Sequence, residues 1–214
     1  MKDKAKKTTK VLSRICILFF IAFVLFLAQD KTTADNDVMQ AQIAQKILRF
    51  HVIANSDSRQ DQRVKLLVRD VVGNLMEERL MGAKSLEESR QIVEENMDEI
   101  VQTAIDTLER EGYRYGATAS LEVTEFPEKT YGSYTFPAGR YEALRVVLGK
   151  GEGHNWWCVL YPNLCFRGSV YEIVDENAKE ELREVLSTEE YESIFRSGRV
   201  LPRLKFLEYF KKNS

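Results

Sequence analysis

Apolar residues recur at helical spacing along two long stretches of the chain. Between residues 60 and 80 the apolar positions are Val64, Leu67, Val68, Val71, Val72, Leu75 and Met76. From Ser85 to about Arg110 they are Ile92, Val93, Met97, Ile100, Val101, Ala104, Ile105 and Leu108. This spacing places the apolar side chains of each stretch on one face of an α-helix. We therefore predict two long amphipathic helices that each pack one face against a core.

Stretches with strand-like patterns precede and follow these helices. Residues 46–54 alternate the apolar Leu48, Phe50 and Val52 with residues of the opposite face, as in a half-buried strand. Three or four further strands are predicted in residues 117–126, 131–137, 140–153 and 155–162. The last of these is nearly all apolar, which is typical of a strand buried on both faces. The connections are too short for helical crossovers, so we predict an α+β fold with a mainly antiparallel sheet backed by the two helices.

The start of the chain has the pattern of an export segment. Residues 1–14 hold six cations and one anion, and residues 15–28 are an uncharged apolar run. At a rise of about 1.5 Å per residue this run spans roughly 21 Å, less than the roughly 30 Å hydrocarbon core of a bilayer. A cleaved signal peptide is therefore favoured over an uncleaved signal anchor, and both remain open. In either case the segment contacts the membrane at least transiently, and residues from about 35 onward become extracytoplasmic.

These patterns divide the chain into three parts. Residues 1–28 are the signal peptide or anchor, residues 29–45 are a polar tether without periodicity, and residues 46–214 form a single exported domain. Lys and Arg total 31 and Asp and Glu total 33, so the chain after residue 14 holds 25 cations and 32 anions. Such an acidic body, without a basic stripe interleaved with aromatic residues, predicts no nucleic-acid partner.

Two cysteines lie outside the apolar leader. Cys158 and Cys165 have a spacing that matches no common zinc pattern, and His154 is the only histidine nearby. In an oxidising compartment the two thiols can form a disulfide, and two buried reduced thiols are the alternative. We expect no bound metal ion and no cofactor.

A polar cluster at residues 55–61 joins the first predicted strand to the first helix. Ser58 and Asp61 have the spacing of a capping box, which gives the cluster a structural role. Ser56 and Ser58 lack the G-x-S-x-G setting of a catalytic nucleophile. The alternative is an exported cell-wall or peptide hydrolase that uses His51 and Asp57, with or without a bound metal. Because no convincing catalytic set is present, we expect that the chain is not an enzyme.

Two long blocks of the sequence resemble the signature blocks of the stage II sporulation protein R family. These blocks are HVIANSDSRQDQRVKLLVRDVV, which begins at His51, and GHNWWCVLYPNLCF, which begins at Gly153. The resemblance covers about residues 46–210. The chain departs from the family pattern at His154, where an acidic residue is expected, and this departure weakens a catalytic role for that histidine.

The resemblance implies a secreted signalling protein of sporulation. Members of this family are exported from the forespore into the space between the two septal membranes, where they activate a membrane-embedded aspartic protease of the mother cell. That protease removes the pro-sequence of sigma-E. The surface that contacts the protease is expected to include Asn55, Ser56, Asp57, Asp61, Asn155, Trp156 and Trp157. The two segments that contain these residues also have a structural alternative, in which Ser58 and Asp61 cap a helix and Trp156 or Trp157 fills the core.

Overall fold

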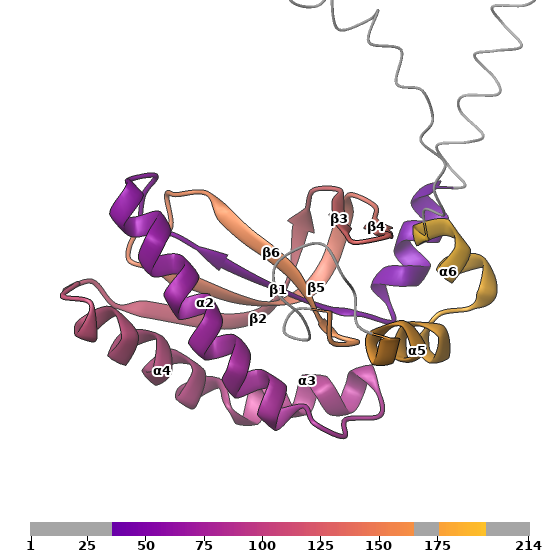
Figure 1. Cartoon of the computed structure of the whole chain (residues 1–214), viewed down its shortest axis with the longest axis horizontal. Coiled ribbons are helices and arrows are strands. Elements are labelled where there is room, and N and C mark those ends of the chain that lie inside the picture. The colour runs from indigo at the N-terminus through magenta and orange to yellow at the C-terminus, as the bar shows by residue number, and fades with distance from the viewer. Residues whose placement is uncertain (1–35, 165–175, 196–214) are drawn as a thin grey trace, which may run out of the picture.

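The computed structural model describes residues 36–164 and 176–195, and a four-stranded sheet lies at its centre (Figure 1). The strands are β1 (Leu48–Ile53), β2 (Ala117–Phe126), β5 (Gly139–Leu148) and β6 (Asn155–Tyr161), in the order β2-β5-β1-β6. β5 pairs antiparallel with β2, β6 pairs antiparallel with β1, and β1 pairs parallel with β5. The predicted α+β class is confirmed, and the sheet is mixed. β1 lies between β5 and β6, which run in opposite directions, so it must be parallel to one of them.

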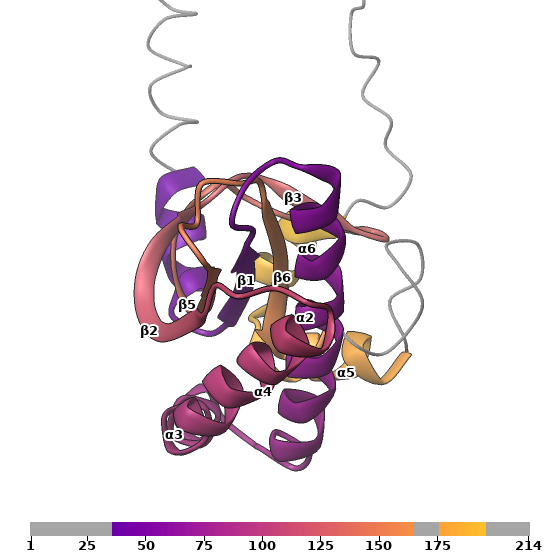
Figure 2. The same cartoon turned by 90° about the vertical axis from the view of Figure 1, so that its left-hand side faces the viewer.

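Three helices follow β1 in the chain. They are α2 (Arg59–Arg79), α3 (Leu86–Glu95) and α4 (Met97–Arg110), and α2 and α4 lie side by side against the sheet (Figures 1 and 2). The helix predicted between residues 60 and 80 is α2. The second predicted helix is interrupted, because Asn96 leaves helical geometry and its side-chain amide donates to the carbonyl of Ile92 at 2.7 Å. An asparagine side chain that bonds to the local backbone competes with helix continuation.

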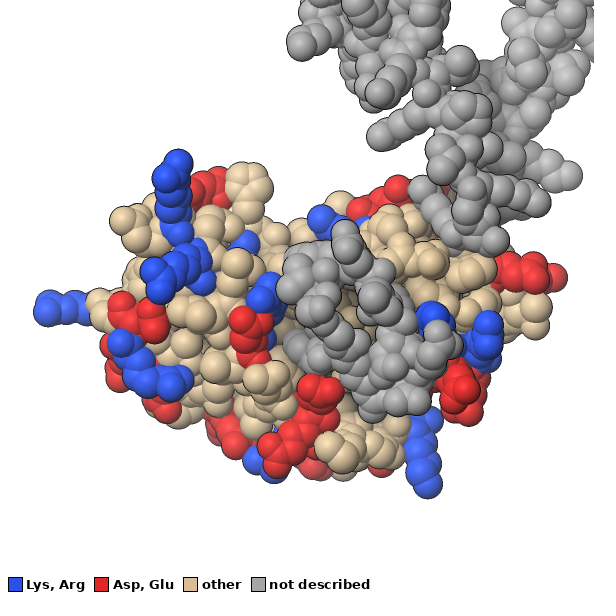
Figure 3. All heavy atoms as spheres, viewed as in Figure 1, with Lys and Arg blue, Asp and Glu red and all other residues tan. Residues whose placement is uncertain are grey.

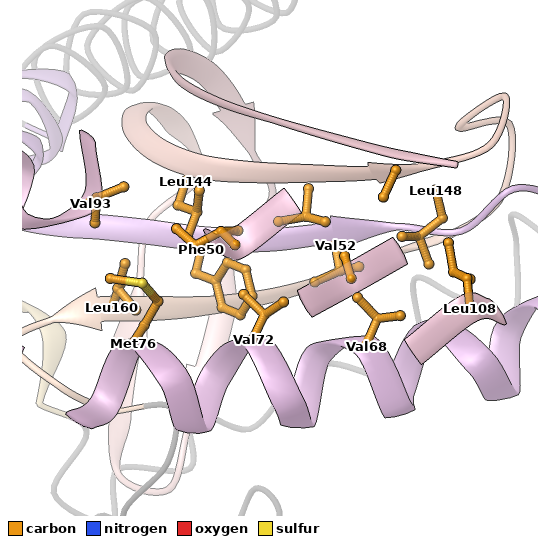
Figure 4. Packing of buried hydrophobic residues seen from close by; sticks show 14 of the residues in the cluster. Phe50, Val52, Val68, Val72, Met76, Val93, Leu108, Leu144, Leu148 and Leu160 are labelled. Atoms are coloured by element: carbon orange, nitrogen blue, oxygen red, sulfur yellow. The ribbon is translucent and has the colours of Figure 1, made fainter. Parts of the chain in front are cut away.

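The first core lies between the sheet and these helices. Phe50 and Val52 of β1 point toward Val68, Val72 and Met76 of α2 (Figure 4). All five side chains are fully buried. The apolar stripe of α2 therefore packs against the core, as its spacing predicts.

A second core lies on the other face of the sheet. It is covered by the hairpin of β3 (Lys129–Tyr131) and β4 (Tyr134–Phe136), by a helix at residues 36–44, and by α5 (Glu176–Val185) and α6 (Thr188–Ile194). All six residues of β1 are consequently buried. The prediction of a half-buried β1 was wrong, because the residues that cover its second face come from distant parts of the sequence.

The prediction of a polar tether over residues 29–45 was wrong for its described part. Residues 36–44 are helical, and Ile43 and Ile47 are fully buried in the second core with Met39 packed beside them. Met39 and Ile43 are four positions apart and lie on one face of this helix, and Ile47 follows just after the helix ends. The segment is also held by Lys46, whose ammonium group lies 2.6 Å from the carboxylate of the buried Glu190 in α6.

Two other expectations concern segments at the edges of the described structure. β6 was predicted to be buried on both faces, but it is an outer strand of the sheet, and its residues Asn155, Trp156 and Trp157 are only partly buried. The predicted signal or anchor segment at residues 1–28 lies outside the described residues. Among the helices that the structure describes, none has the length and apolar character to cross a membrane.

Candidate functional site

The junction between β1 and α2 is built around the cap of the helix. Ser58 has extended backbone geometry, and its hydroxyl accepts a hydrogen bond from the backbone N–H of Asp61 at 3.1 Å. This bond confirms the predicted capping role of Ser58. The reciprocal bond of a capping box is not made, because the carboxylate of Asp61 has other partners.

The carboxylate of Asp61 is the centre of a small hydrogen-bond network. One oxygen accepts from the Asn55 amide at 2.9 Å and from the Ser56 hydroxyl at 2.5 Å, and the other accepts from the Tyr115 hydroxyl at 2.7 Å. Burial alone would raise the pKa of Asp61, but the hydrogen bonds from Ser56, Tyr115 and Asn55 outweigh it and lower the pKa. Asp61 therefore remains ionised and acts as a buried anchor for its neighbours. Burial and the bond to Asp61 raise the pKa of Tyr115.

The loop between β5 and β6 is attached directly to this junction. The side-chain oxygen of Asn55 accepts from the backbone N–H of Lys150 at 3.0 Å. The backbone carbonyl of Asn55 accepts from the backbone N–H of Glu152 at 3.2 Å. Gly149 has a φ of +55°, and a Cβ at this position would clash with the Asn55 side chain. The backbone N–H of Gly153 also donates to the carbonyl of Ala54 at 2.9 Å, which joins the two sequence blocks that resemble the sporulation family. The polar atoms of Asn55, Ser56 and Asp61 are largely used within this substructure.

The outer rim of the junction is formed by Asp57 and His154. One carboxylate oxygen of Asp57 accepts from the backbone N–H of His154 at 2.6 Å and also contacts its Nδ1 atom. The bonds from the side chain and backbone of His154 lower the pKa of Asp57. Lys65 of α2 donates to the carbonyl of His154 at 2.9 Å. No hydroxyl or thiol group of a described residue hydrogen-bonds to His154, so this exposed pair lacks the nucleophile of a catalytic triad.

His51 lies on the other face of β1, away from this rim. Its side chain is 1% exposed, and neither ring nitrogen has a hydrogen-bond partner among the described residues. The ring stacks on Trp157, with centroids 4.8 Å apart and planes inclined by 13°. Burial, followed by the charges of Arg145 and Arg49, lowers the pKa of His51 to about 4. The structure therefore does not bring His51 and Asp57 together, as the hydrolase alternative requires.

The two tryptophans of β6 point to opposite faces of the sheet, as a strand requires. Trp156 packs edge-to-face on Phe50 in the first core, and the guanidinium carbon of Arg69 lies 5.1 Å from its ring centroid. Trp157 packs on His51 and Phe126 in the second core. Both tryptophans and Asn155 are partly exposed. These three residues can therefore support the core and contact a partner at the same time.

The expected cysteine pair is only half described. Cys158 is buried in β6 at 2% exposure, and Cys165 lies outside the described residues. Their disulfide stays a prediction.

Sequence reasoning missed a buried arginine in the second core. Arg49 is fully buried, and its guanidinium group donates to the carbonyl of Cys158 at 2.9 Å and to the Tyr131 hydroxyl at 3.2 Å. Its guanidinium carbon also lies 4.4 Å from the centroid of the Phe126 ring. Burial lowers the pKa of Arg49. The sequence places Arg49 on the second face of β1 but carries no local signal that this face is covered.

Among the described residues, no group of histidine, cysteine and carboxylate side chains could hold a metal ion.

Comparison with known proteins identifies the family. A profile of stage II sporulation protein R matches residues 44–171, which is more than half of the 214 residues. Stage II sporulation protein R of Bacillus subtilis (strain 168) is 37% identical over 155 residues, covering 71% of this chain and 69% of that protein. No solved structure gives a significant match. The matched range contains both blocks that meet at the β1–α2 junction, and the chain belongs to the stage II sporulation protein R family.

Proposed function

We propose that this chain is exported from the forespore and activates a membrane-embedded aspartic protease of the mother cell, which then processes pro-sigma-E. Its membership in the sporulation family is the observation that carries this proposal. The apolar run at residues 15–28, preceded by a basic segment, supports export. Activation of a protease requires a folded binding surface outside the cytoplasm and no nucleophile of its own.

The contact surface is the rim where the two sequence blocks meet. Asp57 is half exposed there, and Trp156 and Trp157 are partly exposed on the neighbouring strand β6. Tryptophan side chains are common among the residues that dominate binding energy at interfaces. Asn55, Ser56 and Asp61 have a different role, because their polar atoms bond to one another and to the β5–β6 loop. They hold the surface in place.

Binding can activate the protease only by favouring its active arrangement. A ligand shifts a conformational equilibrium by its difference in affinity for the two states, and equal affinity shifts nothing. The rim must therefore contact a part of the protease that differs between the inactive and active arrangements. The hydrolase alternative has no comparable support, since His51 is buried and Asp57 is bonded to His154.

The proposal is tested by co-expressing the full chain with the protease and pro-sigma-E in cells that lack other sporulation proteins. Processing of pro-sigma-E, followed by immunoblotting, is expected only when the chain and a catalytically intact protease are both present. A variant that lacks residues 15–28 is expected to fail, because its domain stays in the cytoplasm. Processing that is equally strong without the chain, or with the variant that lacks the apolar run, would refute the proposal.

A further inference from the structure

β2 is an outer strand of the central sheet and has a long open edge. It pairs with β5 over its whole length without a register shift, and no described strand lies beside its other edge (Figure 2). Proteins commonly protect such edges with lysine, proline or a β-bulge. The sequence of β2, ATASLEVTEF, has neither residue, and its pairing has no bulge. β2 is therefore competent to pair with a further strand.

A hydrogen bond at the start of β2 shows which of its backbone groups face the open edge. Gly116 and Gly149 are the next pair in the β2–β5 register, and the N–H of Gly149 donates to the carbonyl of Gly116 at 2.8 Å. Hydrogen-bonded pairs alternate with non-hydrogen-bonded pairs along antiparallel strands, so the even-numbered residues of β2 bond to β5. The N–H and carbonyl groups of the odd-numbered residues point outward, and these residues are Ala117, Ala119, Leu121, Val123 and Glu125. Within residues 36–164 and 176–195, nothing hydrogen-bonds to these outward groups.

The opposite edge of the sheet differs, because groups of the same chain already bond to the backbone of β6. The carbonyl of Trp157 accepts from the Tyr131 hydroxyl at 3.0 Å. The carbonyl of Val159 accepts from the backbone N–H of Leu164 at 3.3 Å. Of the two outer strands, β2 is therefore the one that is available for pairing.

The charges of the domain limit which strand can pair with β2. The described residues hold 17 Lys and Arg against 27 Asp and Glu, and both signs occur side by side on the face shown in Figure 3. On β2, Glu122 lies 3.4 Å from the Nε atom of Arg145, and Glu125 lies 3.9 Å from the Nε atom of Arg140. Both arginines belong to β5, so the carboxylates of β2 already have basic neighbours within the chain. A partner strand therefore needs no basic residues, and β2 of another copy meets this condition.

We propose that β2 pairs antiparallel with β2 of a second copy of this chain, about a two-fold axis at Leu121, so that the two sheets become one. Leu121 then lies opposite Leu121 of the second copy, and Ala119 lies opposite Val123. Every outward backbone group from Ala117 to Glu125 gains a hydrogen-bond partner in this arrangement. The same surface is used by both copies, as a two-fold interface requires.

The side chains favour this register over its neighbours. Directly opposed like charges destabilise a strand pair, whereas apolar pairs stabilise it. With the axis at Leu121, Glu122 lies opposite Ser120. An axis at Glu122 would place the two copies of this glutamate opposite each other, and an axis at Ser120 would pair a shorter part of the strand. The proposed register also covers Val123, which is 54% exposed in the single chain.

Pairing through β2 is compatible with the proposed contact surface and does not rest on it. β2 and β6 are at opposite edges of the sheet. Trp156 and Trp157 of β6 therefore keep their exposure when two copies pair through β2.

The oligomeric state is measured by sedimentation of the full chain in a density-matched detergent. We expect the parent chain to sediment as a dimer that dissociates on dilution. A parent chain that sediments as a monomer at every concentration would overturn the proposal, and would leave the open edge of β2 to a strand of another protein.

Val123→Pro tests whether the open edge makes the contact. The N–H of Val123 faces outward, so proline at this position removes no hydrogen bond to β5 and is tolerated as it is on other edge strands. It also removes a donor from the contact with the second copy. The dissociation constant of the dimer is expected to rise about tenfold. Circular dichroism verifies that this variant and those below are folded.

A pair of double variants tests the register, because Thr118 lies opposite Thr124 of the second copy. Thr118→Glu with Thr124→Glu places like charges opposite each other, and the dissociation constant is expected to rise about tenfold. The matched control is Thr118→Lys with Thr124→Glu, which places opposite charges at the same positions and should dimerise at least as well as the parent chain. Equal dissociation constants for the two double variants, or an unchanged constant for Val123→Pro, would overturn the proposal.

Failure of this proposal and failure of the proposed function are distinguishable. A monomeric chain that supports pro-sigma-E processing would refute only the dimer. A dimeric chain that responds to the variants as expected and supports no processing would refute only the proposed function.

Discussion

The two faces of β1 are equally buried, but they differ in chemistry. Phe50 and Val52 face the helices and pack among the apolar side chains of the first core. Arg49 and His51 face the second core, where some of their nitrogen atoms are buried among aromatic rings and have no hydrogen-bond partner among residues 36–164 and 176–195. Both faces exclude water, yet only the first gains the full benefit of apolar burial. Complete burial in this strand therefore does not mean that each residue contributes equally to stability.

The difference also separates stability from its dependence on pH. Well-packed apolar side chains contribute to stability at any pH, whereas a buried titratable group without an acceptor lowers stability when it must bind a proton. The helix-facing side of β1 should therefore dominate the stability of the domain, and the second face should dominate the dependence of that stability on pH.

The largest effect on stability is expected from Phe50→Ala. This change removes a fully buried ring between the sheet and α2 and also its edge-to-face contact with Trp156. Such truncations cost about 3–5 kcal/mol in the free energy of unfolding. Urea denaturation of the full chain, followed by circular dichroism, measures the loss. Val123→Ala is the control, because Val123 is 54% exposed on β2 and should change the free energy by less than about 0.5 kcal/mol.

The second face should make stability depend on pH through His51. Burial lowers its pKa from 6.5 to about 4 in the folded chain, so between these values the unfolded state binds a proton that the folded state does not. Stability therefore falls as the pH falls from about 6.5 to 4, by about 3 kcal/mol in total. Urea midpoints measured across this range test the sign. Between pH 6.5 and about 5 the slope should nearly disappear in His51→Gln and persist in His154→Gln, and an unchanged slope in His51→Gln would contradict the assignment. Below about pH 5 the carboxylates of Asp57 and Asp61, whose pKa values are lowered in the folded chain, add a slope of the same sign in every variant.

The sequence predicts the helix-facing side of β1 well, because its signals are local. The stripe from Val64 to Met76 and the cap at Ser58 are each contained within about 20 residues, and the structure has both. Three short signals were missed or misread. The helix at residues 36–44 was missed because Met39, Ile43 and Ile47 are too few to stand out in a polar segment. The break at Asn96 was missed because the apolar stripe continues on both sides of it. β6 was misread because it has the composition of an inner strand but lies at the edge of the sheet.

The second face could not be predicted because its contacts join distant parts of the sequence. Arg49 meets Phe126, Tyr131 and the carbonyl of Cys158, which are 77 to 109 positions away. No local pattern shows that a strand position with a polar residue will be covered. The candidate residues at the junction were found from the family resemblance and from turn chemistry. Their bonds to the loop at Lys150 became visible only in the folded chain.

The junction at the end of β1 should give an intermediate effect. Asp61→Asn removes the charge that accepts from Asn55, Ser56 and Tyr115, and in either orientation its amide NH2 group faces at least one donor. The expected cost is about 2 kcal/mol of unfolding free energy. Ser58→Ala removes only the cap and should cost about 1 kcal/mol. Equal costs for the two variants would mean that the carboxylate network adds nothing beyond the cap.

The smallest effect on stability, and a large one on function, is expected at Asp57. Asp57 and Asp70 are matched carboxylates, with side chains that are 54% and 55% exposed, but only Asp57 lies at the rim where the two sequence blocks meet. Neither Asp57→Ala nor Asp70→Ala should move the urea midpoint measurably, because water replaces the lost partner at an exposed site. In the co-expression assay, Asp57→Ala should reduce pro-sigma-E processing, and Asp70→Ala should leave it unchanged. Equal processing by both variants would show that the contact with the protease does not depend on Asp57 and would refute its place in the contact surface.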